Sequence, residues 1–356
     1  MFSRRSLKYY VGLVILFGTS VFSFQIFTRS SALAEAQALY SRGDLVHALQ
    51  RGLDHLERRP WDRDAAKTVA LCLSRLDRAS SAEPYYRRSG NWPILNLNEA
   101  QIRAFGLTRA NLRDEAVVAY REILSRWIDD PLALQRLATV YLTMSRYPDA
   151  LEIARRLAAV PGKEVLGYAL IGTIAHQDGI PEDASAAYQR LFEIDPTLRE
   201  LPIPRELFWS EFVGDLIESG RPADALKYLR TPLSETPDDP VLLDLDGQVA
   251  FQLGEFEAAE IAWKRASVAN PKRPRPWLGL GQIALRRGEF EESIRLFDKS
   301  VTLDPSDPEA RYQKSLAERR AGRIEAAERS RKQSEALRAK LKAPNRGMGS
   351  IPGKSP

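Results

Sequence analysis

The chain is poor in the residues from which most catalytic and metal sites are built. It contains one cysteine, Cys72, and three histidines, His47, His55 and His176, in 356 residues. A single cysteine excludes an intramolecular disulfide, and no cysteine or carboxylate stands at metal-ligand spacing from the histidines. The sequence also lacks a glycine-rich phosphate loop, a G-x-S-x-G elbow and an H-E-x-x-H motif. We therefore expect neither an enzyme nor a protein with a metal or cofactor.

The chain also lacks a dense excess of charge of one sign. Lys and Arg number 52 against 47 Asp and Glu, a net charge of +5. Duplex-binding proteins concentrate a far denser basic stripe. The segment Lys272-Arg273-Pro274-Arg275 is a local basic patch. An RNA-binding helical repeat is therefore kept only as an alternative function of another class.

One segment lacks charge altogether. Residues 9–28 form a run of twenty uncharged positions, which as a helix would span about 30 Å, the thickness of a bilayer core. Arg4, Arg5 and Lys8 precede the run, and fewer basic residues follow it closely. The length of the run predicts a single-pass anchor, and the excess of positive charge before it predicts the orientation of that anchor. Its N-terminus would be cytoplasmic and the remaining body periplasmic or otherwise extracytoplasmic.

A cleaved signal peptide is the alternative reading of the same segment. Ala32-Leu33-Ala34 has the small residues of a cleavage site. Cleavage there would release a secreted or periplasmic soluble protein. The apolar run is longer than a usual signal-peptide core, so the anchor is the main prediction and cleavage the alternative.

A 34-residue period organises the rest of the chain. Seven positions near the C-terminus recur 34 residues later: Gly247, Gly254, Phe256, Ala259, Trp263, Ala266 and Pro271 correspond to Gly281, Gly288, Phe290, Ser293, Phe297, Ser300 and Pro305. This pattern resembles the tetratricopeptide repeat, a hairpin of helix A and helix B about 34 residues long. The resemblance implies an all-α fold, a right-handed α-solenoid of about nine such hairpins preceded by one transmembrane helix.

The same register extends over nine units. They begin at Arg29, Arg63, Leu97, Pro131, Val165, Glu206, Pro240, Pro274 and Pro308. The twentieth residue of each unit is small: Ala48, Ala82, Ala116, Ala150, Ala184, Ala225, Ala259, Ser293 and Ala327. We expect the residues at positions 8 and 20 to be small because helices A and B cross there. Position 15 lies in the turn between them, so we expect it to be left-handed.

These observations divide the chain into six segments. They are a cytoplasmic segment (1–8), a transmembrane helix or signal anchor (9–28), repeats one to five (29–198), an insertion (199–205), repeats six to nine (206–341) and a disordered tail (342–356). The insertion is read as a longer loop between repeats, with a hinge as the alternative. Arg311 and Arg331 stand where tetratricopeptide repeats have bulky apolar groups, which predicts a polar cap on the last hairpin, with a basic protein-binding surface as the alternative.

The resemblance also implies a binding surface, because helix A lines the concave groove of such repeats. The residues that we expect in a partner-binding groove are Leu132, Arg136, Leu166, Leu170, Gln177, Leu207, Val241, Leu245, Phe251 and Gln252. The groove would be mostly apolar and would accept an amphipathic helix or an extended peptide. The alternative is that many of these side chains pack between repeats. We thus predict a membrane-tethered scaffold or adaptor that binds protein partners, in envelope assembly or secretion, without a small-molecule substrate.

Overall fold

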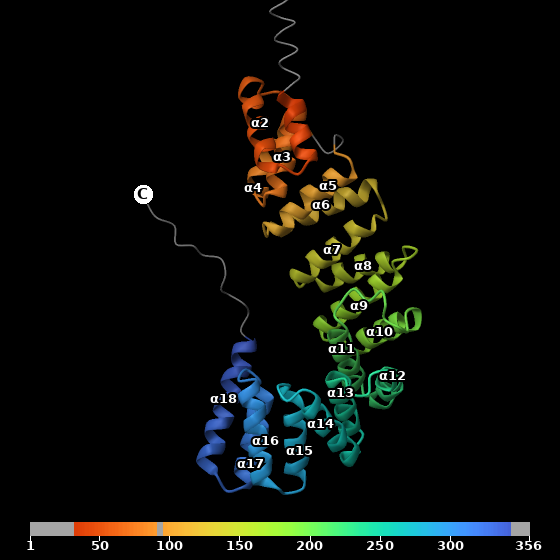
Figure 1. Cartoon of the computed structure of the whole chain (residues 1–356), viewed down its shortest axis with the longest axis vertical. Coiled ribbons are helices and arrows are strands. Elements are labelled where there is room, and N and C mark those ends of the chain that lie inside the picture. Colours follow the sequence, from red (N-terminus) through yellow and green to blue (C-terminus); the bar gives the residue numbers. More distant parts are fainter. Residues whose placement is uncertain (1–31, 91–94, 343–356) are drawn as a thin grey trace, which may run out of the picture. The chain divides into compact units, whose positions relative to one another are not determined.

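The computed structural model describes residues 32–90 and 95–342. Every regular element in these ranges is a helix, and no strand occurs there (Figure 1). Residues 32–41 are helical. They are followed by α2 (Leu45–Arg58), α3 (Arg63–Arg75), α4 (Ala79–Arg88), α5 (Leu97–Arg109), α6 (Arg113–Arg126), α7 (Pro131–Thr143), α8 (Tyr147–Ala158), α9 (Glu164–Asp178), α10 (Pro181–Ile194), α11 (Arg205–Glu218), α12 (Pro222–Glu235), α13 (Pro240–Gln252), α14 (Phe256–Ala269), α15 (Pro274–Arg286), α16 (Phe290–Leu303), α17 (Pro308–Arg320) and α18 (Ile324–Lys342).

The helices alternate as the 34-residue register predicts. Helix A of units two, three, four, seven, eight and nine begins at the predicted residue, and α9 and α11 begin one residue earlier than predicted. Partners such as α13 and α14, α15 and α16, or α17 and α18 pack against each other. The all-α solenoid expected from the sequence is therefore confirmed for the described part of the chain.

The turn between helices A and B is left-handed in every unit. The residues at position 15 all have positive φ: Gly43, Asp77, Asn111, Ser145, Gly179, Gly220, Gly254, Gly288 and Gly322. Glycine adopts this region freely, and Asn and Asp tolerate it because their side chains bond locally. This position was predicted from the sequence and is confirmed.

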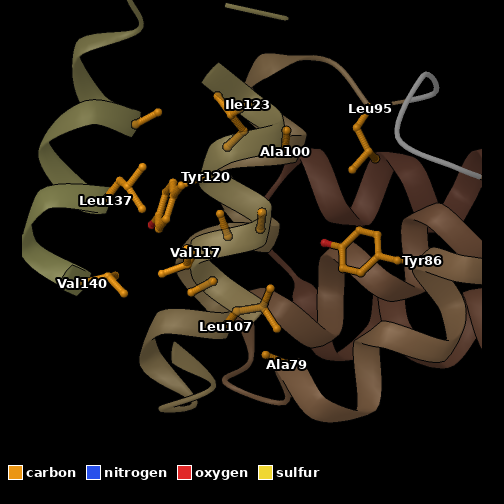
Figure 2. Close-up of a cluster of buried hydrophobic side chains, with 14 of the residues drawn as sticks. Ala79, Tyr86, Leu95, Ala100, Leu107, Val117, Tyr120, Ile123, Leu137 and Val140 are labelled. Carbon is orange, nitrogen blue, oxygen red and sulfur yellow. The ribbon is translucent and has the colours of Figure 1, made fainter. Parts of the chain in front are cut away.

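Small residues are buried where the helices cross. The alanine or serine at position 20 is at most 3% exposed in all nine units. At Gly247 a β-carbon would lie 2.7 Å from Trp263 Nε1, and at Gly281 it would lie 2.6 Å from Phe297 Cε1. Aromatic side chains fill the gaps between hairpins, as Tyr120 does beside Leu137 and Val140 (Figure 2). Small residues that let two helices approach closely therefore alternate along the stack with aromatic residues that fill the gaps between hairpins.

Several A helices begin with an aspartate cap. Asp62, Asp130, Asp239 and Asp307 each accept a hydrogen bond from a backbone N–H of the first turn. Prolines follow directly at Pro131, Pro240 and Pro308 and occupy the first helical turn, where a missing N–H costs nothing. The Asp-Pro pair thus ends the loops before α7, α13 and α17 and fixes where these three helices start.

The chain divides into two compact parts that each contain several repeats, with the boundary inside α9. We call residues 1–174 the N-terminal unit and residues 175–356 the C-terminal unit. The insertion predicted at 199–205 lies in the C-terminal unit; residues 199–204 belong to the loop between α10 and α11, and Arg205 begins α11. Arg205 donates to the Thr197 carbonyl at 2.7 Å, and the Glu200 N–H donates to Asp195 at 2.9 Å. The insertion is thus a longer loop with its own hydrogen bonds.

Three further predictions concern the segments at the two ends of the chain. The transmembrane helix or signal anchor predicted at residues 9–28 and the cytoplasmic segment before it lie outside the described residues. The tail predicted at residues 342–356 also lies outside them, apart from Lys342, which ends α18. No helix within residues 32–90 and 95–342 is both long and apolar enough to cross a membrane. The polar last hairpin is observed: Arg331 pairs with Glu328 and Glu335, and Arg311 bonds to Gln333.

Candidate functional site

The A-helix residues predicted to form a groove differ widely in their accessibility. Leu132, Gln177, Leu207 and Gln252 are exposed, whereas Arg136, Leu166, Leu170, Val241 and Phe251 are half-buried. Leu245 is only 4% exposed. Because its side chain is enclosed by the helices, the prediction that Leu245 lines an accessible groove is wrong.

In the N-terminal unit, one exposed aromatic ring was missing from the prediction. Phe105 of α5 is 41% exposed, and the guanidinium of Arg136 on α7 lies 4.2 Å from the centre of its ring. Leu132, one turn before Arg136, is 37% exposed. Leu166 and Leu170 instead pack against the hydrophobic core. An aromatic ring stacked with arginine is a common anchor of protein interfaces, so Phe105, Leu132 and Arg136 form one candidate contact.

In the C-terminal unit, the helix A side of three successive hairpins forms a pocket of about 200 Å³. Its lining comes from α13 and α15, the Trp263 ring of α14 and the start of α17. The residues are Asp244, Gln248, Phe251, Gln252, Trp263, Arg275, Leu278, Gly279, Gln282, Asp307 and Glu309. Among the predicted groove residues, Phe251 and Gln252 are the two that line this pocket. Three glutamines and four charged residues make it more polar than the apolar groove expected.

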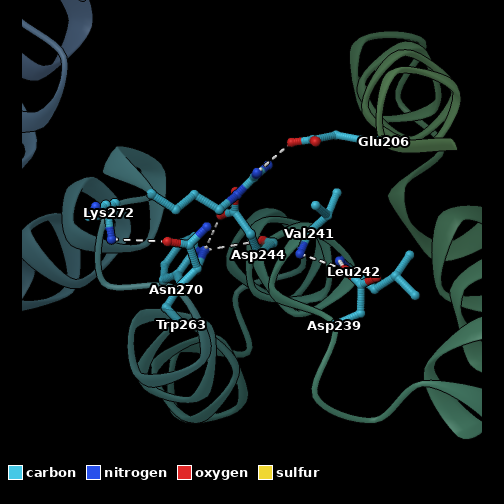
Figure 3. A network of polar contacts seen from close by, with 9 residues as sticks. Glu206, Asp239, Val241, Leu242, Asp244, Trp263, Asn270 and Lys272 are labelled. Atoms are coloured by element: carbon cyan, nitrogen blue, oxygen red, sulfur yellow. Dashed lines mark hydrogen bonds and ion pairs between the residues drawn. The ribbon is translucent and has the colours of Figure 1, made fainter. Parts of the chain in front are cut away.

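A buried ionic network holds the base of the pocket. Trp263 Nε1 donates to the carbonyl oxygen of Asp244 at 3.1 Å and to its Oδ1 at 3.2 Å, and Figure 3 shows the two side chains meeting. Arg273 donates to Asp244 Oδ2 at 2.9 Å and to Glu206 at 2.7 Å. Burial raises the pKa of Asp244, although Arg275 and Arg273 oppose this. The network fixes Trp263 against α13 and links α11 to the loop before α15.

Several polar side chains that line the pocket can still form hydrogen bonds or ion pairs with a ligand. Arg275 is exposed and makes no ion pair with any described residue. Asp307 uses one carboxylate oxygen to cap α17, and Glu309 pairs with Arg338 at 3.0 Å. Gln248 and Gln282 each stand at position 9 of their unit, the position that Phe105 occupies in unit three. The repeat register could therefore have identified Phe105, Gln248 and Gln282 as groove residues, whereas the prediction favoured leucines.

A larger cavity, of about 370 Å³, lies among α6, α7 and α8 of the N-terminal unit. Two of its charged side chains are already engaged. Asp149 accepts from Arg146 at 2.8 Å, and Arg156 donates to the Ile128 carbonyl at 2.6 Å. This cavity is on the helix B side and is a weaker candidate than the pocket between α13 and α15.

The histidines and the cysteine have structural surroundings. His55 contacts Asp62 at 2.9 Å, His176 contacts Asp215 at 2.8 Å, and His47 lies beside the helix cap Asp44. Burial raises the pKa of the Cys72 thiol to about 11, which makes it a poor nucleophile. Within the described residues, no group of three His, Cys, Asp or Glu side chains could hold a metal ion.

Comparisons with known proteins agree with the repeat. Residues 135–198 and 245–308 match the family model described as tetratricopeptide repeat. The chain is 29% identical over 188 residues to cellulose synthase operon protein C of Pseudomonas fluorescens, a match covering 48% of this chain and 14% of that protein. It is 31% identical over 96 residues to human tetratricopeptide repeat protein 33, covering 27% of this chain and 37% of that protein. The chain therefore spans less than half the length of these relatives.

A solved structure shows the same fold. The C-terminal part of a tetratricopeptide repeat-containing protein from Cytophaga hutchinsonii aligns with a TM-score of 0.54 over 70% of this chain and 99% of that chain, at 11% identity. A likeness at this identity concerns the fold alone. The repeat model, the 34-residue register and the stacked hairpins therefore agree that residues 135–198 and 245–308 carry tetratricopeptide repeats.

Proposed function

We propose that this chain is a scaffold that binds an extended peptide segment of a partner protein in the pocket between α13 and α15. The pocket itself carries the proposal, because it combines a half-buried aromatic ring with glutamines on two neighbouring A helices. Phe105, Leu132 and Arg136 would provide a second contact on the N-terminal unit. Tetratricopeptide repeat proteins bind protein partners such as peptides.

The chemistry of the lining suits a peptide backbone. Each glutamine side chain offers both a carbonyl acceptor and an NH₂ donor, the two groups that pair with the N–H and C=O of an extended strand. Gln248 and Gln252 are one turn apart on α13, and Gln282 is on α15. Phe251 supplies apolar contact, while Arg275 and Asp307 offer opposite charges to the side chains of the peptide.

The place of the scaffold in the cell is a further proposal that rests on residues 9–28. If this segment anchors the chain, the helical body would be held at the membrane on the extracytoplasmic side, in envelope assembly or secretion. If the chain is cleaved after Ala34, the same body would act as a secreted or periplasmic protein.

A photo-crosslinking amino acid at position 252 tests the binding proposal in cells. We expect a discrete adduct with a partner at this position, and none from the same group at Val268, which is 81% exposed on helix B of the same unit. Adding Gln282→Lys and Arg275→Glu to the position 252 variant should suppress the adduct. Equal adducts at positions 252 and 268, or an adduct that survives both substitutions, would refute the pocket as the binding site.

A separate experiment places the body of the chain. Protease added to intact spheroplasts should digest the helical body if it is extracytoplasmic, and protection would reverse the proposed orientation. The mass of the purified chain then separates the two forms, because cleavage would leave a protein that begins at Glu35.

A further inference from the structure

Charge is distributed very unevenly within the C-terminal unit. The terminal hairpin, residues 308–342, has eleven basic and five acidic residues, a net charge of +6, whereas the whole chain has +5. Residues 175–239, which include α10 to α12, have six basic and fourteen acidic residues, a net charge of −8. Two regions of opposite charge therefore lie at the two ends of this unit, separated along the chain by α13 to α16.

The acidic excess is exposed at the turns between helices A and B. Asp178, Glu182 and Asp183 flank the turn between α9 and α10, and Glu218 ends α11. All four are exposed, and none pairs with a basic side chain of the described residues. The hydrogen bond between His176 and Asp215 brings the two turns close together. We call these four residues the acidic edge.

The basic counterpart is at the equivalent turn of the last hairpin. Arg319 and Arg320 end α17, are exposed and make no ion pair with any described residue. Arg323, in the turn, pairs with Glu291; of the acidic residues nearest in sequence, Glu318 is buried and Glu325 is exposed. We call Arg319, Arg320 and Arg323 the basic edge. The A helices α11, α13, α15 and α17 pack in succession, and both edges lie at the ends of A helices where the chain turns into helix B.

Each edge also exposes one isoleucine. Ile180 in the acidic turn is 37% exposed, and Ile324 beside the basic edge is 63% exposed. Ile180 directly precedes α10, and Ile324 stands 34 residues after Phe290, at a position where two earlier units carry phenylalanine. Two turns of opposite charge, each with an exposed isoleucine, are complementary in charge and in apolar contact.

We propose that the acidic edge of one chain binds the basic edge of a second copy. In an antiparallel pair, each copy offers both edges, so one two-fold axis forms two identical contacts and closes the assembly as a dimer. A single exposed ion pair contributes little, but formation of the first contact raises the effective concentration for the second. The two edges do not neutralise each other within one chain because two hairpins separate them.

Charge reversal with rescue tests this dimer. The full chain is kept in non-ionic detergent because of residues 9–28, and its mass is followed by light scattering and sedimentation. Asp178→Lys with Glu218→Lys, or Arg319→Glu with Arg320→Glu, should each raise the dimer Kd at least tenfold. The acidic-edge changes place lysine at helix C-termini, where positive charge is favoured, so folding should be preserved. Circular dichroism checks this for both variants.

Mixing the two variants gives the decisive result. In the mixture, the unchanged basic edge of one variant meets the unchanged acidic edge of the other, and the two reversed edges are again of opposite charge. Mixed dimers should therefore return to within about threefold of the native Kd, and rising salt should weaken them as it weakens the native dimer. A monomeric native chain at low salt, or no recovery in the mixture, overturns the proposal. Association that depends on the basic edge alone would also overturn it and would assign that edge to a different acidic partner.

Discussion

Replacing Gly247 with alanine should destabilise the C-terminal unit, although alanine is the better helix former. The new methyl group would lie 2.7 Å from both Cδ1 and Nε1 of Trp263. The ring is 4% exposed, and its two hydrogen bonds to Asp244 hold it against the same helix. It therefore has little room to move without losing a hydrogen bond.

The expected change in the free energy of unfolding is the sum of three effects, two that destabilise the folded chain and one that stabilises it. Overpacking a well-filled core costs about 1–3 kcal/mol. The higher helix propensity of alanine offsets about 1 kcal/mol, and loss of the Trp263 hydrogen bond would cost about 1 kcal/mol again. We expect a net loss of about 1–3 kcal/mol. For a unit of this size, each kcal/mol lowers the Tm by about 2–4 °C.

Gly214 provides the matched control. It lies in the middle of α11, and no atom stands within 4 Å of a β-carbon built there. Gly214→Ala should therefore raise the stability by about 0.5–1 kcal/mol through propensity alone. Thermal unfolding of the full chain, followed by circular dichroism, measures both variants. If Gly247→Ala stabilised the protein as Gly214→Ala does, the reasoning from close packing at position 8 would be refuted.

Three other predictions concern single residues. Ser145 has a φ of 55°; Ser145→Gly should raise the free energy of unfolding by about 0.5–1 kcal/mol and Ser145→Val should lower it, as urea titrations would show. Burial raises the pKa of Asp215 from 3.8 to about 6, so the folded chain binds a proton there that the unfolded chain lacks, and stability should fall as pH rises from about 4 to 6. Asp215→Asn should flatten the measured pH profile in that window. Buried Cys72 should react with a polar thiol reagent only after unfolding, and rapid labelling of the native chain would contradict its burial.

Most of the fold could be predicted from the sequence because the same steric requirements recur at the same positions of every repeat. Small residues at position 20 and left-handed turns at position 15 each have a local steric cause, so the residue type reveals the structure. A break such as the loop after α10 also shows in the spacing, because it shifts the register of every later unit. Even Asp77, Asn111 and Ser145, which are not glycines, fitted the turn.

The candidate site was predicted less well because accessibility depends on neighbours in space. Leu245 and Phe251 both face helix A neighbours in the register, yet Leu245 is buried and Phe251 lines the pocket. Asp244 bonds to Arg273, which is 29 residues away in the sequence. No local pattern in the sequence indicates such a pairing.

Hydrogen exchange of the full chain with its captured partner tests whether the chain binds that partner through its A helices. Once photo-crosslinking has identified a partner, amide protection is measured with and without the segment of that partner found in the adduct. The account predicts slower exchange in the A helices α13 and α15, with little change in α14 and α16 behind them. Protection that falls mainly on α14 and α16, or no protection in the C-terminal unit, would contradict a scaffold that binds through its A helices.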